Sequence, residues 1–118
     1  MYQLNRRFTL LLLAAVATAC SAELHQNRWH DAQYSLRAAE DAGAEDYPPA
    51  ARLLASARRE LMRSRSTWDN GDELNAGLLL DRSEADAQLA LQLTRTKHER
   101  EKARAAWAEV QTTQLDGR

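Results

Sequence analysis

The sequence predicts an all-α protein, an antiparallel helical hairpin extended to a three-helix arrangement with a long projecting C-terminal helix. Beyond its first 19 residues the chain is rich in Ala, Leu, Arg and Glu and poor in β-branched and aromatic residues, a composition that favours helices. Gly and Pro occur at only a few positions, so long stretches contain no helix-breaking residue. Apolar residues recur at steps of three and four, the spacing of one helix face.

The N-terminal residues have the pattern of an export signal. Asn5-Arg6-Arg7 supplies positive charge, and an apolar run of 12 residues follows from Phe8 to Ala19. A helix needs about 20 apolar residues to cross a bilayer, so this run is too short to span one and has the length of a signal-peptide core. We therefore expect residues 1–19 to be a removable signal peptide.

The apolar run ends in Ala17-Thr18-Ala19-Cys20, with small side chains at the third and first positions before a cysteine. This pattern resembles the lipobox of bacterial lipoproteins. The resemblance implies cleavage between Ala19 and Cys20 and covalent attachment of lipid, including acyl chains such as palmitate, to Cys20. Because Cys20 is the only cysteine, it forms no intramolecular disulfide. Ala17-Thr18-Ala19 also fits an ordinary signal-peptidase site, so a secreted, unlipidated protein is the alternative.

The residue after the cysteine bears on location. In Gram-negative lipoproteins an Asp at this position tends to retain the protein in the inner membrane, whereas this chain has Ser21. The resemblance therefore implies a lipid-anchored protein on the periplasmic face of the outer membrane. Cleavage would remove two arginines and no acid, leaving 14 basic and 17 acidic residues, a net charge of −3. We expect residues 20–118 to form one small helical domain that binds no nucleic acid.

The first predicted helix covers about residues 22–42. It ends at Gly43, because glycine accepts the left-handed backbone conformation that commonly follows a helix. The second covers about 48–68 and starts at Pro48, since proline is tolerated in a first helical turn, where its missing N–H has no partner to lose.

The third predicted helix covers about residues 73–113. Asp69-Asn70-Gly71 is a strong turn signal before it, and Asp72 can cap its first turn. No Gly or Pro interrupts the next residues before Gly117, except Gly77 near the start, so the helix reaches about 60 Å at 1.5 Å per residue.

Each predicted helix has an apolar face directed toward the others. The face of the third helix is the widest, as expected if that helix packs against both neighbours. The assigned residues are Trp29, Ala32, Leu36 and Ala39 in the first helix; Ala50, Leu53, Leu54, Ala57, Leu61, Ser64 and Trp68 in the second; and Leu74, Leu78, Leu79, Leu80, Ala85, Leu89, Ala90 and Leu93 in the third. The apolar pattern lapses over residues 94–102 and resumes at Ala103. The C-terminal half of the third helix should therefore project, or pair with another molecule.

Arginines dominate the second predicted helix. Arg58 and Arg65 fall beside its apolar face, where we expect interhelical ion pairs. Arg52, Arg59 and Arg63 lie within about 20° of one line on the opposite face at 100° per residue. A solvated face that keeps the protein soluble explains this arginine strip most simply. The alternative is a docking strip for anionic groups of lipid headgroups, peptidoglycan or an acidic partner.

The remaining polar residues suggest no catalytic or metal site, and we expect no cofactor other than the covalent lipid on Cys20. His25 and His30 are five residues apart and do not share a helix face as a metal-binding pair would. Residues 69–73 have part of a calcium-loop pattern without its spacing or its final glutamate, so a turn and helix cap explain them. Trp107, on the predicted projecting segment, could anchor an interface.

Residues 43–100 resemble the DUF4398 domain of bacterial envelope lipoproteins, an alanine-rich helical hairpin. The resemblance rests on Tyr47-Pro48, Ala57, Leu61, Asn70-Gly71-Asp72, Ala76, Leu80, Ala85, Ala87 and Ala90. In this chain Glu73 follows Gly-Asp where family members often have an aromatic residue. The family has no established activity, and its members resemble companions of OmpA-like envelope proteins, which implies an architecture and a location rather than a reaction.

These observations predict a non-enzymatic helical scaffold or interaction module, anchored to the envelope, that holds an OmpA-like partner or a second copy of itself, for example as a coiled coil. The alternative is an accessory module that recognises an anionic envelope ligand through the arginine strip. A hydrolase is disfavoured, because no nucleophile and base are paired in any known pattern.

Overall fold

The computed structural model describes residues 23–117, and within them all regular structure is helical, which confirms the predicted all-α class. A helix over residues 23–41, here called the N-terminal helix, is followed by the short 3-10 helix η1 (Ala44–Asp46). Helices α2 (Pro48–Asp69) and α3 (Glu73–Asp116) complete the chain. The bounds of α2 and α3 differ from the predicted ones only at their C-terminal ends.

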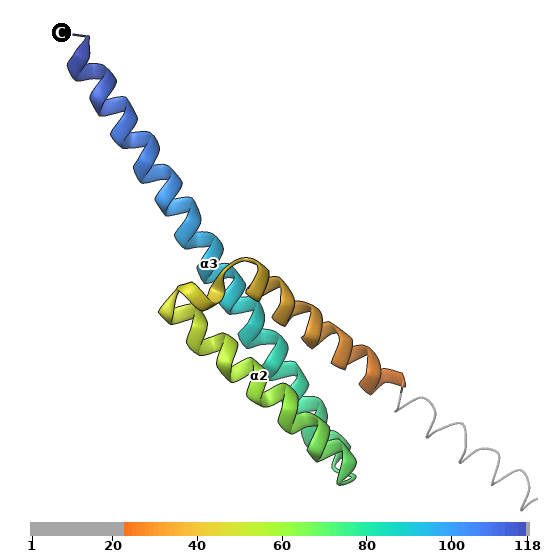
Figure 1. Cartoon of the computed structure of the whole chain (residues 1–118). Helices are drawn as coiled ribbons and strands as arrows, with labels where there is room; N and C mark the ends of the chain where they lie inside the picture. Colours follow the sequence, from red (N-terminus) through yellow and green to blue (C-terminus); the bar gives the residue numbers. More distant parts are fainter. Residues whose placement is uncertain (1–22, 118) are drawn as a thin grey trace, which may run out of the picture.

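The three long helices lie side by side in an up-down-up order (Figure 1). The N-terminal helix and α3 run in the same direction, and α2 runs antiparallel to both. One end of this bundle, the loop end, carries residues 42–47. The other, the turn end, carries the α2–α3 turn and the start of the N-terminal helix, where His25 contacts Trp68. The chain therefore enters the bundle at the turn end.

Glycines form both connections. Gly43 has φ +84° and Gly71 has φ +83°, a conformation that costs other residues energy because of their Cβ atom. At the loop end the Gly43 N–H donates to the Glu40 carbonyl at 2.9 Å, which closes the last turn of the N-terminal helix. At the turn end the Asp72 carboxylate accepts from the Asn75 N–H at 3.3 Å, the cap predicted for α3.

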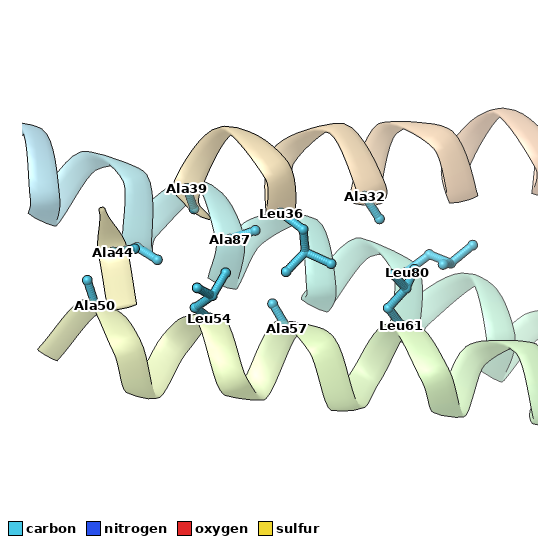
Figure 2. Packing of buried hydrophobic residues seen from close by; sticks show 11 residues of the cluster. Ala32, Leu36, Ala39, Ala44, Ala50, Leu54, Ala57, Leu61, Leu80 and Ala87 are labelled. Carbon is cyan, nitrogen blue, oxygen red and sulfur yellow. The ribbon is translucent and has the colours of Figure 1, made fainter. Parts of the chain in front are cut away.

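The core contains mostly alanine, with few large side chains. Its buried apolar residues are Ala32, Leu36, Ala39, Ala44, Ala50, Leu54, Ala57, Leu61, Ala76, Leu80, Ala87 and Ala90. Figure 2 shows the leucines of the three helices converging between rows of alanine methyl groups. Small side chains let helix backbones approach closely, so larger residues at these positions would force the helices apart.

Three buried hydroxyl groups in this core, those of Ser64, Ser83 and Thr94, have carbonyl partners. Ser83 Oγ on α3 donates to the Ala57 carbonyl of α2 at 2.8 Å and links the two helices directly. Ser64 Oγ and Thr94 Oγ1 donate within their own helices, to Leu61 at 2.7 Å and to Ala90 at 2.9 Å. Hydroxyl groups so satisfied can be buried without a large desolvation cost.

The C-terminal half of α3 extends beyond the bundle, as the sequence predicts (the blue segment of Figure 1). Helix α3 has 44 residues, so it is about 66 Å long at 1.5 Å per residue. Thr94 is its last buried residue, and Lys97 lies over the Tyr47 ring at 5.6 Å. All residues from 98 to 117 are exposed. We call residues 98–116 the projecting segment.

One sequence prediction about packing is wrong. Leu74, Leu78, Ala85 and Leu89 were assigned to the core-facing side of α3, but all four are exposed. The buried residues of α3 include the predicted Leu80 and Ala90, and the others are Ala76, Gly77, Ser83, Ala87 and Thr94. The physical reason is that two close neighbours cover only about half of a helix's circumference, and here small residues occupy the covered half.

Candidate functional site

An open cleft of about 520 Å³ lies at the turn end of the bundle, between the N-terminal helix and the last turns of α2. We call it the aromatic cleft. It is lined by His25, Gln26, Trp29, His30, Arg65, Trp68 and Asp69. Its position follows from the antiparallel packing, which brings the start of one helix beside the end of the next, about 40 residues further along the chain.

One stacked ring pair and one cation–π pair line the aromatic cleft. The His25 and Trp68 rings are 3.8 Å apart between centroids and inclined by 15°, so they stack face to face. The Arg65 guanidinium carbon lies 6.0 Å from the Trp29 ring centroid, at the outer limit of a cation–π contact. Each tryptophan therefore has a nitrogen-bearing group from the other helix near its ring, and the two pairs join the N-terminal helix to α2.

Burial against Trp68 lowers the pKa of the His25 imidazole from its ordinary value, because the charged form is desolvated. Glu73 opposes this shift, whereas the nearby Arg28 adds to it. The buried Nδ1 atom has no hydrogen-bond partner among the described residues. Protonation of His25 is therefore disfavoured by the fold, mainly through desolvation.

We expect NMR titration of the His25 ring protons to give a pKa below the ordinary value of about 6.5. The substitution Trp68→Ala uncovers the imidazole and should raise the His25 pKa back toward that value. Trp107→Ala, on the projecting segment, is the control and should leave the pKa unchanged. An unchanged low pKa of His25 in Trp68→Ala would show that stacking on Trp68 does not cause the shift.

The sign of the linked pH effect follows from this shift. The unfolded chain binds a proton at His25 more readily than the folded chain does, so stability falls as the pH drops through about 6.5. The contribution is complete above the unfolded-state pKa and is lost between that value and the lower folded-state pKa. Acidification should therefore weaken the contact between the N-terminal helix and α2 at the turn end.

The sequence did not predict the aromatic cleft. It identified Trp29 and Trp68 as packing positions and treated His25 and His30 only as an unsuitable metal pair. In the structure those histidines line the cleft together with both tryptophans. Within the described residues no three His, Cys, Asp or Glu side chains are arranged to hold a metal ion. The signal that could have found the cleft is the pair of tryptophans at the same predicted end of two antiparallel helices.

The arginine strip lies on the outer face of α2. Arg52, Arg59 and Arg63 are all exposed, and none of them forms an ion pair with the residues that the structure describes. The three side chains are therefore accessible to solvent and to an anionic ligand.

Arg58 and Arg65 beside the apolar face of α2 differ in their partners. Arg58 makes the predicted interhelical contacts, with Nη2 at 2.6 Å from both Glu40 Oε1 and Glu45 Oε1. These hydrogen bonds raise the pKa of Arg58. The groups are about half exposed, so each pair contributes about 0–1 kcal/mol. Arg65 contacts the Trp29 ring instead of a carboxylate.

The projecting segment carries the predicted interface residue. Trp107 is 69% exposed, and Val110 and Leu115 are also exposed. Nothing else in the described chain reaches this segment, which lies wholly beyond the loop end (Figure 1). Large apolar side chains on an isolated, well-formed helix are typical of surfaces that bind another chain.

The predicted cleavage and lipidation residues Ala19 and Cys20 lie outside the described residues. Cys20 is three residues before residue 23 in the sequence. No helix among residues 23–117 has the length and apolarity needed to cross a membrane.

Comparison with known proteins gave one match. The sequence pattern of a family described as "Domain of unknown function (DUF4398)" matches residues 28–110. The match extends further at both ends than the resemblance over residues 43–100, and it takes in most of the N-terminal helix and part of the projecting segment. Neither the curated proteins nor the solved structures include a match.

Proposed function

Because the chain belongs to the DUF4398 family, for which no function is described, we propose from its shape and its N-terminal motif that it is a lipid-anchored, non-enzymatic scaffold of the bacterial envelope. In this proposal Cys20 carries the lipid, the protein faces the periplasm from the outer membrane, and the projecting segment holds a partner. An OmpA-like envelope protein and a second copy of this chain are the two candidate partners.

The observation that carries the proposal is the placement of the two ends of the described chain. The N-terminal helix begins at the turn end, beside Trp68, whereas α3 leaves the bundle at the loop end (Figure 1). An anchor at Cys20 would thus be next to the turn end, and the projecting segment would point away from it. Such an arrangement suits a spacer that presents one surface at a distance from the membrane.

The length of α3 bounds that distance. Trp107 lies 33 residues along α3 from Leu74 at the turn end, which corresponds to about 50 Å at 1.5 Å per residue. A bundle standing upright on its anchor would place Trp107 about that far from the membrane surface. A tilted one would place it closer, so a partner must lie within this reach.

A binding rather than catalytic role also agrees with the chemistry of the described side chains. The carboxylates lie mainly on exposed helix faces, and two of them pair with Arg58. Among the described residues, His25 and Glu60 are the groups besides Arg58 whose pKa clearly departs from the ordinary value. Burial, followed by the nearby Asp86, raises the pKa of Glu60, which lies on α2 away from the aromatic cleft.

The anchor is tested by the substitution Cys20→Ser in the natural host envelope or a Gram-negative surrogate. We expect the unchanged protein in the outer-membrane fraction and Cys20→Ser in the soluble periplasmic fraction, because a thiol is needed for diacylglycerol transfer and two or three acyl chains give stable anchoring. The measurement is membrane fractionation followed by immunoblotting, with labelled palmitate as a second readout.

A matched control uses the next residue. Ser21→Asp should keep the lipid and shift the protein toward the inner membrane, which separates loss of lipid from altered sorting. The anchor proposal would be overturned by Cys20→Ser remaining in the membrane pellet, or by an unchanged protein that is soluble and incorporates no palmitate.

A further inference from the structure

The outer side of α3 carries a line of apolar residues that the fold leaves uncovered. Its members share an exposed position and lie within about 60° of helix circumference at 100° per residue. They are Leu74, Leu78, Ala85, Leu89, Ala103, Trp107 and Val110, which we call the outer stripe. Leu74 is 76% exposed and Trp107 69% exposed. Gln92 and Thr96, also exposed, continue the line between Leu89 and Ala103.

The outer stripe is distinct from the face that packs into the bundle. The buried residues Leu80 and Ala87 point in directions about 150° and about 170° away from its midline at 100° per residue. Leu74 and Ala85, and likewise Leu78 and Leu89, are separated by 11 residues, which is close to three helical turns. The outer stripe therefore runs almost straight along α3, for about 54 Å from Leu74 to Val110.

Opposite charges border the outer stripe on its two sides. Asp81 and Glu99 lie about 50° to one side of its midline, and Arg82 and Arg100 lie about 50° to the other. Each acid immediately precedes its arginine in the sequence, so acid and arginine are at nearly the same height, about 1.5 Å apart along the axis. All four side chains are exposed. The two acid–arginine steps are 18 residues, or five turns, apart.

From this arrangement we infer that the outer stripe binds a second copy of the chain, with the two α3 helices parallel and in register. A two-fold axis parallel to the helices brings the acidic side of one copy to the basic side of the other. Asp81 then faces Arg82 of the second copy, Glu99 faces Arg100, and the symmetry repeats both pairs. Leu78, Ala103 and Trp107 meet their own counterparts along the centre.

An antiparallel pair does not have this complementarity. Reversing one helix brings equivalent sides together, so the acidic side of one copy would face the acidic side of the other and the basic side the basic. Within one chain Asp81 and Glu99 have only weak alternatives, since Arg28 is 3.8 Å from Asp81 and the Lys102–Glu99 pair at 3.3 Å is largely exposed. Both acids are therefore available to a second copy.

The parallel orientation rests in part on the proposed function. Two copies anchored through Cys20 in one membrane leaflet both enter their bundles at the turn end, and both projecting segments point the same way. Confinement to a leaflet also raises the effective concentration of each copy for the other. This matters because the outer stripe contains only a few large side chains and two polar interruptions.

Cysteine cross-linking in native membranes tests the pairing on the full chain. In a parallel, in-register dimer every outer-stripe position faces its own copy, so Leu78→Cys, Ala103→Cys and Val110→Cys should each give disulfide-linked dimers under a mild oxidant. Ala105→Cys and Ala108→Cys, exposed on the opposite side of the projecting segment, are the matched controls. We expect the dimer fraction at the outer-stripe positions to exceed that of the controls several-fold.

A charge exchange tests the orientation. Arg100→Glu should lower the dimer fraction of the Ala103→Cys variant several-fold. Glu99 of each copy would then face a carboxylate instead of a guanidinium on the other copy. Adding Glu99→Arg restores opposite charges and should restore the cross-link. A merely structural effect of Arg100 would not be reversed by a second substitution at another residue.

Three outcomes would overturn the inference. Equal cross-linking at outer-stripe and control positions would indicate random collision, and cross-linking at a single outer-stripe position would indicate an antiparallel pair. Cross-links only to another protein would assign the surface to a foreign partner.

Two controls separate this inference from the proposed anchor. The chain without an added cysteine is measured alongside the variants, and every variant is also made with Cys20→Ser. Failure of the anchor proposal appears as a change in membrane fractionation, whereas failure of the dimer inference appears as a loss of selective cross-linking.

Discussion

Replacing Leu80 with alanine is expected to lower the free energy of unfolding by about 2–5 kcal/mol, the range for truncating a buried leucine. Leu80 is 1% exposed and lies on the core face of α3, where it packs with residues of α2 and the N-terminal helix. The core contains four buried leucines among its apolar residues, and the others are alanines. Removing one therefore deletes a large share of the bulky core, and rigid alanine neighbours cannot fill the space.

Leu78→Ala is the matched control for this prediction. Leu78 has the same side chain on the same helix but is 48% exposed on the outer stripe. Its truncation should change the stability of the monomer by about 0.5 kcal/mol or less, as is usual for surface positions. Urea denaturation followed by far-UV circular dichroism, at a concentration where the protein is monomeric, measures both variants. Equal losses of stability in Leu80→Ala and Leu78→Ala would mean that α3 turns a different face toward the bundle.

Enlarging a core alanine is expected to have the second large effect. Ala87 has no exposed surface and lies on the side of α3 that packs against the other helices. Ala87→Leu therefore inserts extra carbon atoms where helix backbones approach closely. Overpacking of this kind typically costs about 1–3 kcal/mol, and a core of small residues offers few side chains that can move aside. The expected result is a lower urea midpoint with an unchanged helical spectrum in the folded state.

The neighbouring alanine on the outer side of α3 provides the comparison. Ala85 is exposed, so Ala85→Leu adds the same atoms into solvent and should leave monomer stability within about 0.5 kcal/mol of the unchanged protein. If Ala87→Leu were as stable as Ala85→Leu, the close helix approach attributed to the alanine rows would not exist.

Local signals in the chain were sufficient to predict where the helices begin and end. Gly43 and Gly71 adopt the left-handed conformation expected at the two connections, Pro48 opens α2, and Asp72 caps α3. These signals act within a few residues of chain, so they can be recognised without knowing what packs against what. The projecting segment was also predictable, because α3 is about twice as long as either neighbour.

Sequence spacing predicted only part of the face that α3 turns toward the bundle. The predicted Leu80 and Ala90 are buried, whereas Leu74, Leu78, Ala85 and Leu89 are exposed. Leucines occur on both sides of this helix, and an apolar count favours the side with Leu74, Leu78 and Leu89. The structure packs the opposite side, where small residues such as Ala76 and Ala87 permit close contact. The decision depends on the fit between helices rather than on hydrophobicity alone.

The candidate surfaces likewise include some that the sequence predicts and some that depend on the fold. The helical class, the two connections, the line of Arg52, Arg59 and Arg63, and the motif at Cys20 can be recognised without a structure, because each depends on residues near one another in the chain. By contrast, the stacking of His25 on Trp68 in a cleft and the uncovered outer stripe of α3 emerge only in the folded chain. Both depend on how one helix is rotated against another, and that rotation results from side-chain packing across the whole bundle.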